Sequence, residues 1–239
     1  MPEREQQLNI LSQEITKQIK DCGLEDQVEH VICEGDEVYG NKMRRSLCDT
    51  RGYYISYVDD DDFILPGYIR LIYHALMLTP DVVTFGSYSP GCITYWSRTN
   101  RDDDSYKDKL GGIKSANHFC VWKRDIALTG VWLPRSYGAD YVWYSLLNTV
   151  YPNLAEVHIK QLLYEYRFNP QLTLCQTRQR IDESLEEGRF ITYYQHCDGR
   201  LFVGVSKDET LPSTIYQSDG SIVSISGMDL YVIKRYEFR

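Results

Sequence analysis

A short apolar segment that runs directly into four consecutive aspartates is the feature that most constrains this chain. Residues 53–58 are rich in β-branched and aromatic side chains, which predicts a buried strand. Asp59–Asp62 follow at once, and Pro66 then opens a predicted helix that runs to about Leu78. Adjacent carboxylates repel one another unless something neutralises them. The segment therefore predicts a strand, an acidic turn that needs compensating charge, and a helix.

Helical and strand patterns alternate along the first third of the chain. Apolar residues from Leu8 to Ile19 repeat at helical spacing and predict an amphipathic helix over residues 3–20. The other elements expected in this part are a strand at 28–33, a helix at 41–50, the strand at 53–58, the helix at 66–78 and a strand at 81–85. Such alternation predicts an α/β fold with a mostly parallel sheet flanked by helices. Ligands of these sheets bind beyond the carboxyl ends of the strands, where Asp59–Asp62 are expected.

The central part of the chain is less regular. Residues 87–118 are polar and Gly-rich and predict a loop or lid with one hairpin. We interpret Asp102–Asp104, within that loop, as solvated. A helix is expected at 141–150 and a strand at 162–168.

The last part of the chain has a different pattern. Residues 171–190 predict a polar helix, and residues 190–239 alternate as short strands do. Turn signals stand at Asp198-Gly199 and Asp219-Gly220. We therefore expect one domain over residues 1–170, and a C-terminal helix and small β-rich extension over 171–239 that pack on it.

Composition excludes several classes of function. The net charge is −8 and the Lys and Arg residues form no run, so nucleic acid is not expected as a partner. No stretch reaches the roughly 20 apolar residues of a transmembrane helix, although peripheral membrane contact stays open. No secretory leader is recognised, and none of the seven cysteines are spaced as Cys-x-x-Cys. Reduced thiols and a cytoplasmic location are the expectation.

The acidic cluster predicts a divalent cation. Mg²⁺ and Mn²⁺ prefer carboxylate oxygens together with substrate phosphates, so a metal at Asp59–Asp62 could bridge the protein and a diphosphate. Two simpler interpretations remain open: a solvated acidic turn, and a helix cap formed by Asp62.

The segment Gly52-Tyr53-Tyr54-Ile55-Ser56-Tyr57-Val58-Asp59-Asp60-Asp61-Asp62 resembles the Asp-x-Asp region of family 2-like glycosyltransferases, which have the GT-A fold. The resemblance implies that Asp59 and Asp61 bind Mn²⁺ or Mg²⁺, with Asp60 and Asp62 as register alternatives. It also implies that the metal holds the diphosphate of a nucleotide-sugar donor, most simply a UDP-sugar, and that Asp60 lies at the donor site.

Two further segments are similar to the acceptor side of that family. They are Asn117-His118-Phe119-Cys120-Val121-Trp122-Lys123-Arg124 and Gly138-Ala139-Asp140-Tyr141-Val142-Trp143. The resemblance makes Asp140 the expected catalytic base, although Ala139 stands where the family has Glu. His118 is a candidate for the metal shell or the donor, and a packing histidine is the alternative. His158-Ile159 and Leu163-Tyr164-Glu165-Tyr166-Arg167 resemble the family's closing strand, so the resemblance covers roughly residues 2–170.

The chain also departs from the family's pattern. The segment Gly40-Asn41-Lys42-Met43-Arg44 resembles a Gly-x-Lys-Arg-Asn motif, whose last two residues differ here. Lys42 could still reach a donor phosphate, or it could be a solvated surface lysine. The family's first strand, which contacts the nucleotide base, is expected to be missing here, because Met1-Pro2-Glu3-Arg4 resembles the residues just after it. Either the chain is shortened or another segment fills the place of that strand. Residues 190–239 are a candidate replacement for that strand.

These features predict an inverting sugar transfer to a hydroxyl acceptor such as a glycan. The metal would stabilise the leaving nucleoside diphosphate, and Asp140 would accept the proton of the acceptor. Trp122, Trp132 and Trp143 are candidates for an acceptor platform, with core packing as the alternative. Three other functions stay open: a non-catalytic carbohydrate-binding relative, a metal-dependent nucleotidyltransferase and a structural Ca²⁺-binding module.

Overall fold

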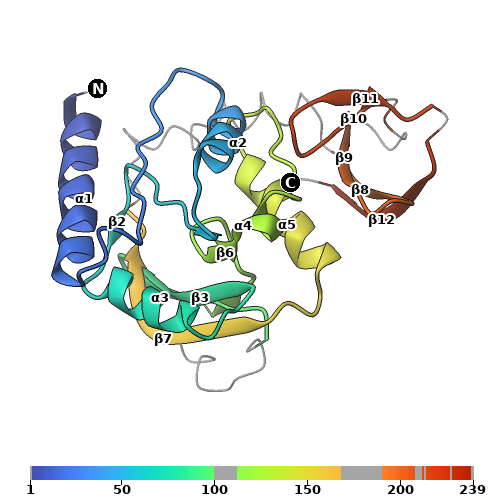
Figure 1. The fold of residues 1–239 in the computed structure, drawn as a ribbon. Helices are drawn as coiled ribbons and strands as arrows, with labels where there is room; N and C mark the ends of the chain where they lie inside the picture. The colour runs from blue at the N-terminus through green and yellow to red at the C-terminus, as the bar shows by residue number, and fades with distance from the viewer. Residues whose placement is uncertain are drawn as a thin grey trace. The chain divides into compact units, whose positions relative to one another are not determined.

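The computed structural model describes residues 2–99, 112–167, 190–207, 212, 214–226 and 228–237 (Figure 1). The chain forms two compact units. The first unit contains residues 1–32, 50–124 and 153–174, and the second contains 33–49, 125–152 and 175–239. The domain boundary expected at residue 170, residues 171–189 of the helix expected at 171–190, and Asp102–Asp104 lie outside the described residues. Phe190, the last residue of that expected helix, belongs to a strand instead.

One mixed sheet organises the first unit. Its strands are β1 (Tyr54–Ile55), β2 (Phe63–Ile64), β3 (Val82–Ser89), β4 (Cys92–Trp96), β5 (Ile113–Lys114), β6 (Val121–Lys123) and β7 (Glu156–Glu165). Its main path runs β1-β6-β3-β4-β5, and β7 pairs with both β3 and β2. The longest strand of the sheet, β7, therefore connects the centre of the sheet to the short strand that follows the acidic turn.

The α/β class is confirmed, but the described sheet is not mostly parallel. β7 is parallel to β3 and β5 to β4, whereas β1–β6, β3–β6, β3–β4 and β2–β7 are antiparallel. One cause is local: Ser89 pairs with Cys92 across a two-residue turn, and so short a connection can join only antiparallel strands. Gly91 adopts φ 77° in this turn, which suits a residue without Cβ.

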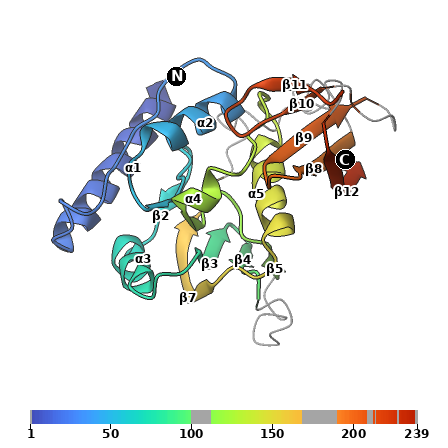
Figure 2. The same cartoon turned by 45° about the vertical axis from the view of Figure 1, so that its right-hand side comes forward.

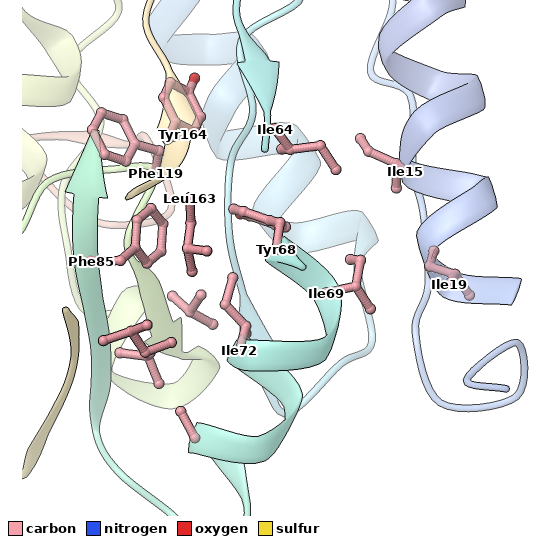
Figure 3. Packing of buried hydrophobic residues seen from close by; sticks show 14 of the residues in the cluster. Ile15, Ile19, Ile64, Tyr68, Ile69, Ile72, Phe85, Phe119, Leu163 and Tyr164 are labelled. Atoms are coloured by element: carbon pink, nitrogen blue, oxygen red, sulfur yellow. The ribbon is translucent and has the colours of Figure 1, made fainter. Parts of the chain in front are cut away.

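Two helices pack on the core of the first unit. The predicted amphipathic helix is present as α1 (Pro2–Asp21). The helix predicted from Pro66 to about Leu78 is α3 (Tyr68–Leu76); Gly67 is its N-cap, so Pro66 precedes the helix and the expectation that it opens the first turn is wrong. Figure 3 shows Ile15 and Ile19 of α1 facing α3, whose Tyr68 and Ile72 lie toward Phe85 of β3. These side chains are buried, so the C-terminal half of α1 is held by apolar packing.

The predicted strands around the acidic turn are shorter in the structure or absent. Of residues 53–58, only Tyr54 and Ile55 form ladder pairs, both with β6. Residues 28–33 form no strand, and Val31 and Ile32 are more than 40% exposed. β-propensity produces a strand only where a partner strand is available, and the described residues offer none here.

The second unit combines helices with an antiparallel sheet. Its helices are α2 (Tyr39–Asp49) and α5 (Ala139–Val150). The short helix α4 (Arg124–Ala127) begins at the last residue of segment 50–124 of the first unit and continues into segment 125–152 of the second. Its strands are β8 (Phe190–His196), β9 (Leu201–Ser206), β10 (Thr214–Tyr216), β11 (Ile222–Ser224) and β12 (Leu230–Glu237), in the order β11-β10-β9-β8-β12. Val142 and Leu146 of α5 share a buried cluster with Tyr193 and Val203, so α5 packs on this sheet (Figure 2).

Both predicted turns of the C-terminal part are confirmed. Asp198-Gly199 lies between β8 and β9, and Asp219-Gly220 lies between β10 and β11. Gly199 and Gly220 have positive φ, at 91° and 83°. Within the described ranges, no helix is long and apolar enough to cross a bilayer.

Candidate functional site

The acidic turn connects β1 to β2. The amide of Asp62 donates to the carbonyl oxygen of Asp59 at 3.1 Å, which closes a tight turn over the four aspartates. Asp59, Asp60 and Asp61 are half-buried, whereas Asp62 is only 4% exposed. The turn therefore presents its first three carboxylates toward the surface and directs the fourth into the protein.

Asp62 anchors the turn from inside. Its Oδ2 accepts the hydroxyl of Tyr164 at 2.7 Å, and its Oδ1 accepts the amide of Arg167 at 2.8 Å. Burial, and then the charge of Asp59, raise the pKa of Asp62 to about 7. Asp62 is not a helix cap, since Gly67 holds the N-cap position of α3 and no side chain caps it.

Tyr164 holds both ends of the turn. Besides donating to Asp62, its hydroxyl oxygen accepts the amide of Asp59 at 3.3 Å. The ring is fully buried and stacks on Phe119, with centroids 4.2 Å apart and an interplanar angle of 11° (Figure 3). The end of β7 and the segment before β6 therefore fix the acidic turn in one conformation.

His118 lies beside the first aspartate of the turn, as the sequence suggested. Its Nε2 is 3.2 Å from Oδ2 of Asp59, and the residue is 7% exposed. The imidazole also packs edge-on against Phe119, with centroids 5.5 Å apart. His118 thus has both a packing role and a polar contact with a candidate metal ligand.

Asp60 binds a residue that the sequence analysis missed. Arg4 of α1 donates from Nε to Oδ2 at 2.6 Å and from Nη2 to Oδ1 at 2.5 Å, which forms a bidentate ion pair. The two residues are 56 positions apart, so no local pattern points to this pair. Tyr164 and the amide of Arg167 were also missed as partners of the turn, for the same reason.

The donor chemistry of the turn suits a hard divalent cation. Asp59 and Asp61 supply carboxylate oxygens, and His118 lies next to Asp59. No group of three or more His, Cys, Asp or Glu side chains with metal-site geometry occurs within the described part of the chain. Mg²⁺ is usually bound by only one or two carboxylates, together with waters and substrate phosphates. Asp59 and Asp61 therefore fit a cation shared with a ligand rather than an all-protein cage.

Lys42 and Asp140 belong to the second unit. Lys42 lies on α2, and Asp140 lies in the first turn of α5, directly after Gly138 and Ala139. A Cβ placed on Gly40 would be 3.1 Å from that of Ala139, so α2 and α5 approach closely at this point. Ala139 is fully buried, which leaves no room for the Glu that the family carries here.

The three tryptophans are core residues, so an acceptor platform made from them is wrong. Trp122, Trp132 and Trp143 are at most 1% exposed. Trp132 and Trp143 stack with centroids 4.9 Å apart, and Trp122 donates its indole N–H to the carbonyl oxygen of Asn117 at 2.8 Å. Burial removes the large ring of Trp122 from water, and the hydrogen bond to Asn117 satisfies its indole N–H.

Comparison with known proteins adds little. No protein-family model and no curated protein matches the chain. A solved structure described as "Crystal Structure of a Mycobacterial Protein" aligns with 71% of this chain at 19% identity and a TM-score of 0.38. The chain spans 58% of that protein's length. At this level the likeness assigns neither a fold family nor a function.

Proposed function

We propose that this protein is a metal-dependent, GT-A-type glycosyltransferase that moves a sugar from a nucleotide-diphosphate donor to a hydroxyl acceptor. The observation that carries the proposal is the fixed acidic turn. Asp62 is pinned by Tyr164 and Arg167, Asp59 and Asp61 are half-buried, and Asp59 lies next to His118. Holding four carboxylates together in one turn lowers stability because the carboxylates repel one another. A cation bound at this turn would offset that repulsion, which explains why the turn is kept.

The residues have separate roles in this proposal. Asp59 and Asp61 hold Mn²⁺ or Mg²⁺, and His118 orients the carboxylate of Asp59. The bound cation supplies positive charge to the diphosphate, the leaving group of the reaction. Lys42 contacts a donor phosphate, as the resemblance to the Gly-x-Lys-Arg-Asn motif implies.

Asp140 is the proposed general base. Its carboxylate accepts the proton of the acceptor hydroxyl while the oxygen of that hydroxyl forms a bond to the anomeric carbon. The bond between the anomeric carbon and the diphosphate oxygen breaks, and the nucleoside diphosphate leaves. A single displacement of this kind inverts the anomeric configuration. Asp140 lies in the first turn of α5, where the resemblance places the Asp of the family's Gly-Glu-Asp motif, and this position supports the role.

A donor screen tests the proposal. UDP-, GDP- and other nucleotide sugars are incubated with the protein and Mn²⁺, with simple glycans as acceptors, and released nucleoside diphosphate is measured. We expect turnover with one donor class, lost in Asp61→Ala and Asp140→Asn and retained in Asp26→Ala, which changes an exposed aspartate of the first unit. Turnover of any donor that survives both Asp61→Ala and chelation of the metal would refute the proposal.

A non-catalytic carbohydrate-binding relative is the second candidate. It is favoured by the protein partners of the turn, since Arg4 pairs with Asp60 and His118 contacts Asp59. This candidate predicts glycan binding without release of nucleoside diphosphate and without metal-dependent donor binding. Titration of the same nucleotide sugars with and without Mn²⁺ distinguishes the two.

A further inference from the structure

The first turn of α1 supplies a fixed positive charge to the acidic turn. Arg4 and Asp60 form two parallel hydrogen bonds of 2.6 and 2.5 Å, and their side chains are 24% and 34% exposed. This geometry fixes the plane of the guanidinium against the carboxylate, so the positive charge of Arg4 is held at a defined position beside Asp60.

Arg4 responds to the whole turn and not only to its hydrogen-bond partner. The hydrogen bond to Asp60 is the largest cause that raises the pKa of Arg4, and the charges of Asp61 and Asp59 raise it further. A cation placed at Asp59 and Asp61 would therefore meet both the carboxylates and a resident guanidinium. Two cations that are stabilised by the same carboxylates oppose one another.

The other groups that face the turn have different partners. His118 is directed at Asp59, and the Asp62 carboxylate binds Tyr164 and the amide of Arg167. The guanidinium of Arg167 pairs with Glu165 at 2.7 Å and lies 4.4 Å from the ring centroid of Phe63. Arg167 thus contacts the turn through its backbone amide, whereas Arg4 contacts it through its charged guanidinium.

We propose that Arg4 is a resident counter-ion that competes with the divalent cation, so that the first turn of α1 sets the metal affinity of the acidic turn. This inference rests on the proposed function, because it needs the cation at Asp59 and Asp61. Without metal, Arg4 offsets the repulsion among the aspartates. When metal binds, the neighbouring guanidinium opposes it, and loss of the Arg4 charge therefore favours the metal-bound state.

The fold allows Arg4 to be changed without releasing α1. Leu11, Ile15 and Ile19 of α1 are buried in the core of the first unit, about two to four helical turns beyond Arg4. Gln18 adds a polar contact, since it donates to the carbonyl oxygen of Leu65 at 3.1 Å. A substitution at Arg4 therefore removes charge from the acidic turn while the helix stays docked.

Mn²⁺ titration calorimetry on Arg4→Gln and wild type, at fixed pH and ionic strength, tests the inference. Lys17→Gln is the matched control, because Lys17 pairs with Asp21 on the exposed face of the same helix. We expect Arg4→Gln to bind Mn²⁺ on the order of tenfold more tightly than wild type, as the loss of a nearby unit charge predicts. The control should match wild type.

A second readout separates charge competition from a folding defect. Without metal, the Tm of Arg4→Gln should fall by a few degrees, and saturating Mn²⁺ should raise it by more than it raises the Tm of wild type. If only Arg4→Gln binds Mn²⁺, competition is supported. Equal or weaker binding by Arg4→Gln overturns the inference and leaves the proposed function standing if wild type binds. Absence of binding in both proteins overturns the inference and the proposed metal site together.

Discussion

Removal of the Tyr164 hydroxyl tests whether its hydrogen bonds to Asp59 and Asp62 stabilise the acidic turn. In Tyr164→Phe, Asp62 loses a hydrogen bond of 2.7 Å and the amide of Asp59 loses one of 3.3 Å, both at a side chain with no solvent exposure. A buried hydrogen bond to a charged group contributes about 1.5–3 kcal/mol, and a neutral one about 0.5–1.5 kcal/mol. Since the second bond is long, we expect a total loss of about 2–4 kcal/mol.

The loss should appear as a lower melting temperature. For a chain of this length, 1 kcal/mol corresponds to roughly 2–4 °C, so the expected loss predicts a fall of about 4–16 °C for Tyr164→Phe. The measurement is best made at pH 8 by calorimetry, because the pKa of Asp62 is about 7 and its carboxylate is then mostly ionised. The variant should also bind Mn²⁺ more weakly, since the turn loses its anchor.

Tyr193→Phe is the matched control. Tyr193 is equally buried, and its hydroxyl donates a hydrogen bond of 3.2 Å to the carbonyl oxygen of Val142 in the second unit. We expect this variant to lose only about 1 kcal/mol and to bind Mn²⁺ as wild type does. If Tyr164→Phe lost no more stability than Tyr193→Phe and bound Mn²⁺ normally, the anchoring role would be wrong.

Three further substitutions test other parts of the structure. The raised pKa of Asp62 favours its protonated form in the folded protein, so ionisation of this group lowers the free energy of unfolding by a few kcal/mol at most as pH rises from about 4 to 7. Urea unfolding at pH 5 and pH 7.5 should therefore show a smaller decrease in the free energy of unfolding for Asp62→Asn than for wild type. Gly40→Ala would place a Cβ 1.8 Å from the carbonyl oxygen of Leu133, and thermal melting should show a loss of about 3 kcal/mol or more. Glu156→Gln weakens bonds from the amide and hydroxyl of Thr99, so we expect a loss of about 1–3 kcal/mol and faster amide exchange at that residue.

Each of these predictions has a control. Asp26→Asn changes an exposed aspartate and should leave the pH dependence of stability unchanged. At Gly91 a Cβ would meet no atom within 4 Å, although φ is 77°, so Gly91→Ala should cost only about 1 kcal/mol. For Glu156→Gln, Glu165→Gln serves as a control in the same strand, since Glu165 does not bind Thr99 in the structure.

Local patterns were enough to predict much of the fold. The 3.6-residue repeat of buried side chains gave α1, and Pro66 with the apolar residues after it gave α3. The turns at Asp198-Gly199 and Asp219-Gly220 followed from turn chemistry that depends on two residues alone. These features need no knowledge of distant partners.

The remaining features depend on long-range partners. Arg4 pairs with Asp60 across 56 residues, and Tyr164 with Asp62 across 102. The strand β6 was also missed, because three residues are too few to indicate a strand or the strands with which they pair. Residues 28–33 show the converse error, since their composition favours a strand that has no partner in the described residues.

The candidate site was predicted in part. Asp59 and His118 were named from the sequence and lie in contact at 3.2 Å. The acidic turn follows β1, as expected from the apolar segment. Why the turn keeps one conformation could not be predicted, because that depends on the Tyr164–Phe119 stack and on burial of Asp62.

Binding of UDP with and without Mn²⁺ tests the central claim most directly, namely that Asp59 and Asp61 hold a cation shared with a diphosphate. Calorimetric titration should show UDP binding to wild type only when Mn²⁺ is present, and Asp61→Ala should weaken it by about 100-fold or more. Asp26→Ala should bind UDP as wild type does. Equal UDP affinity with and without Mn²⁺, or full affinity in Asp61→Ala, would contradict the claim.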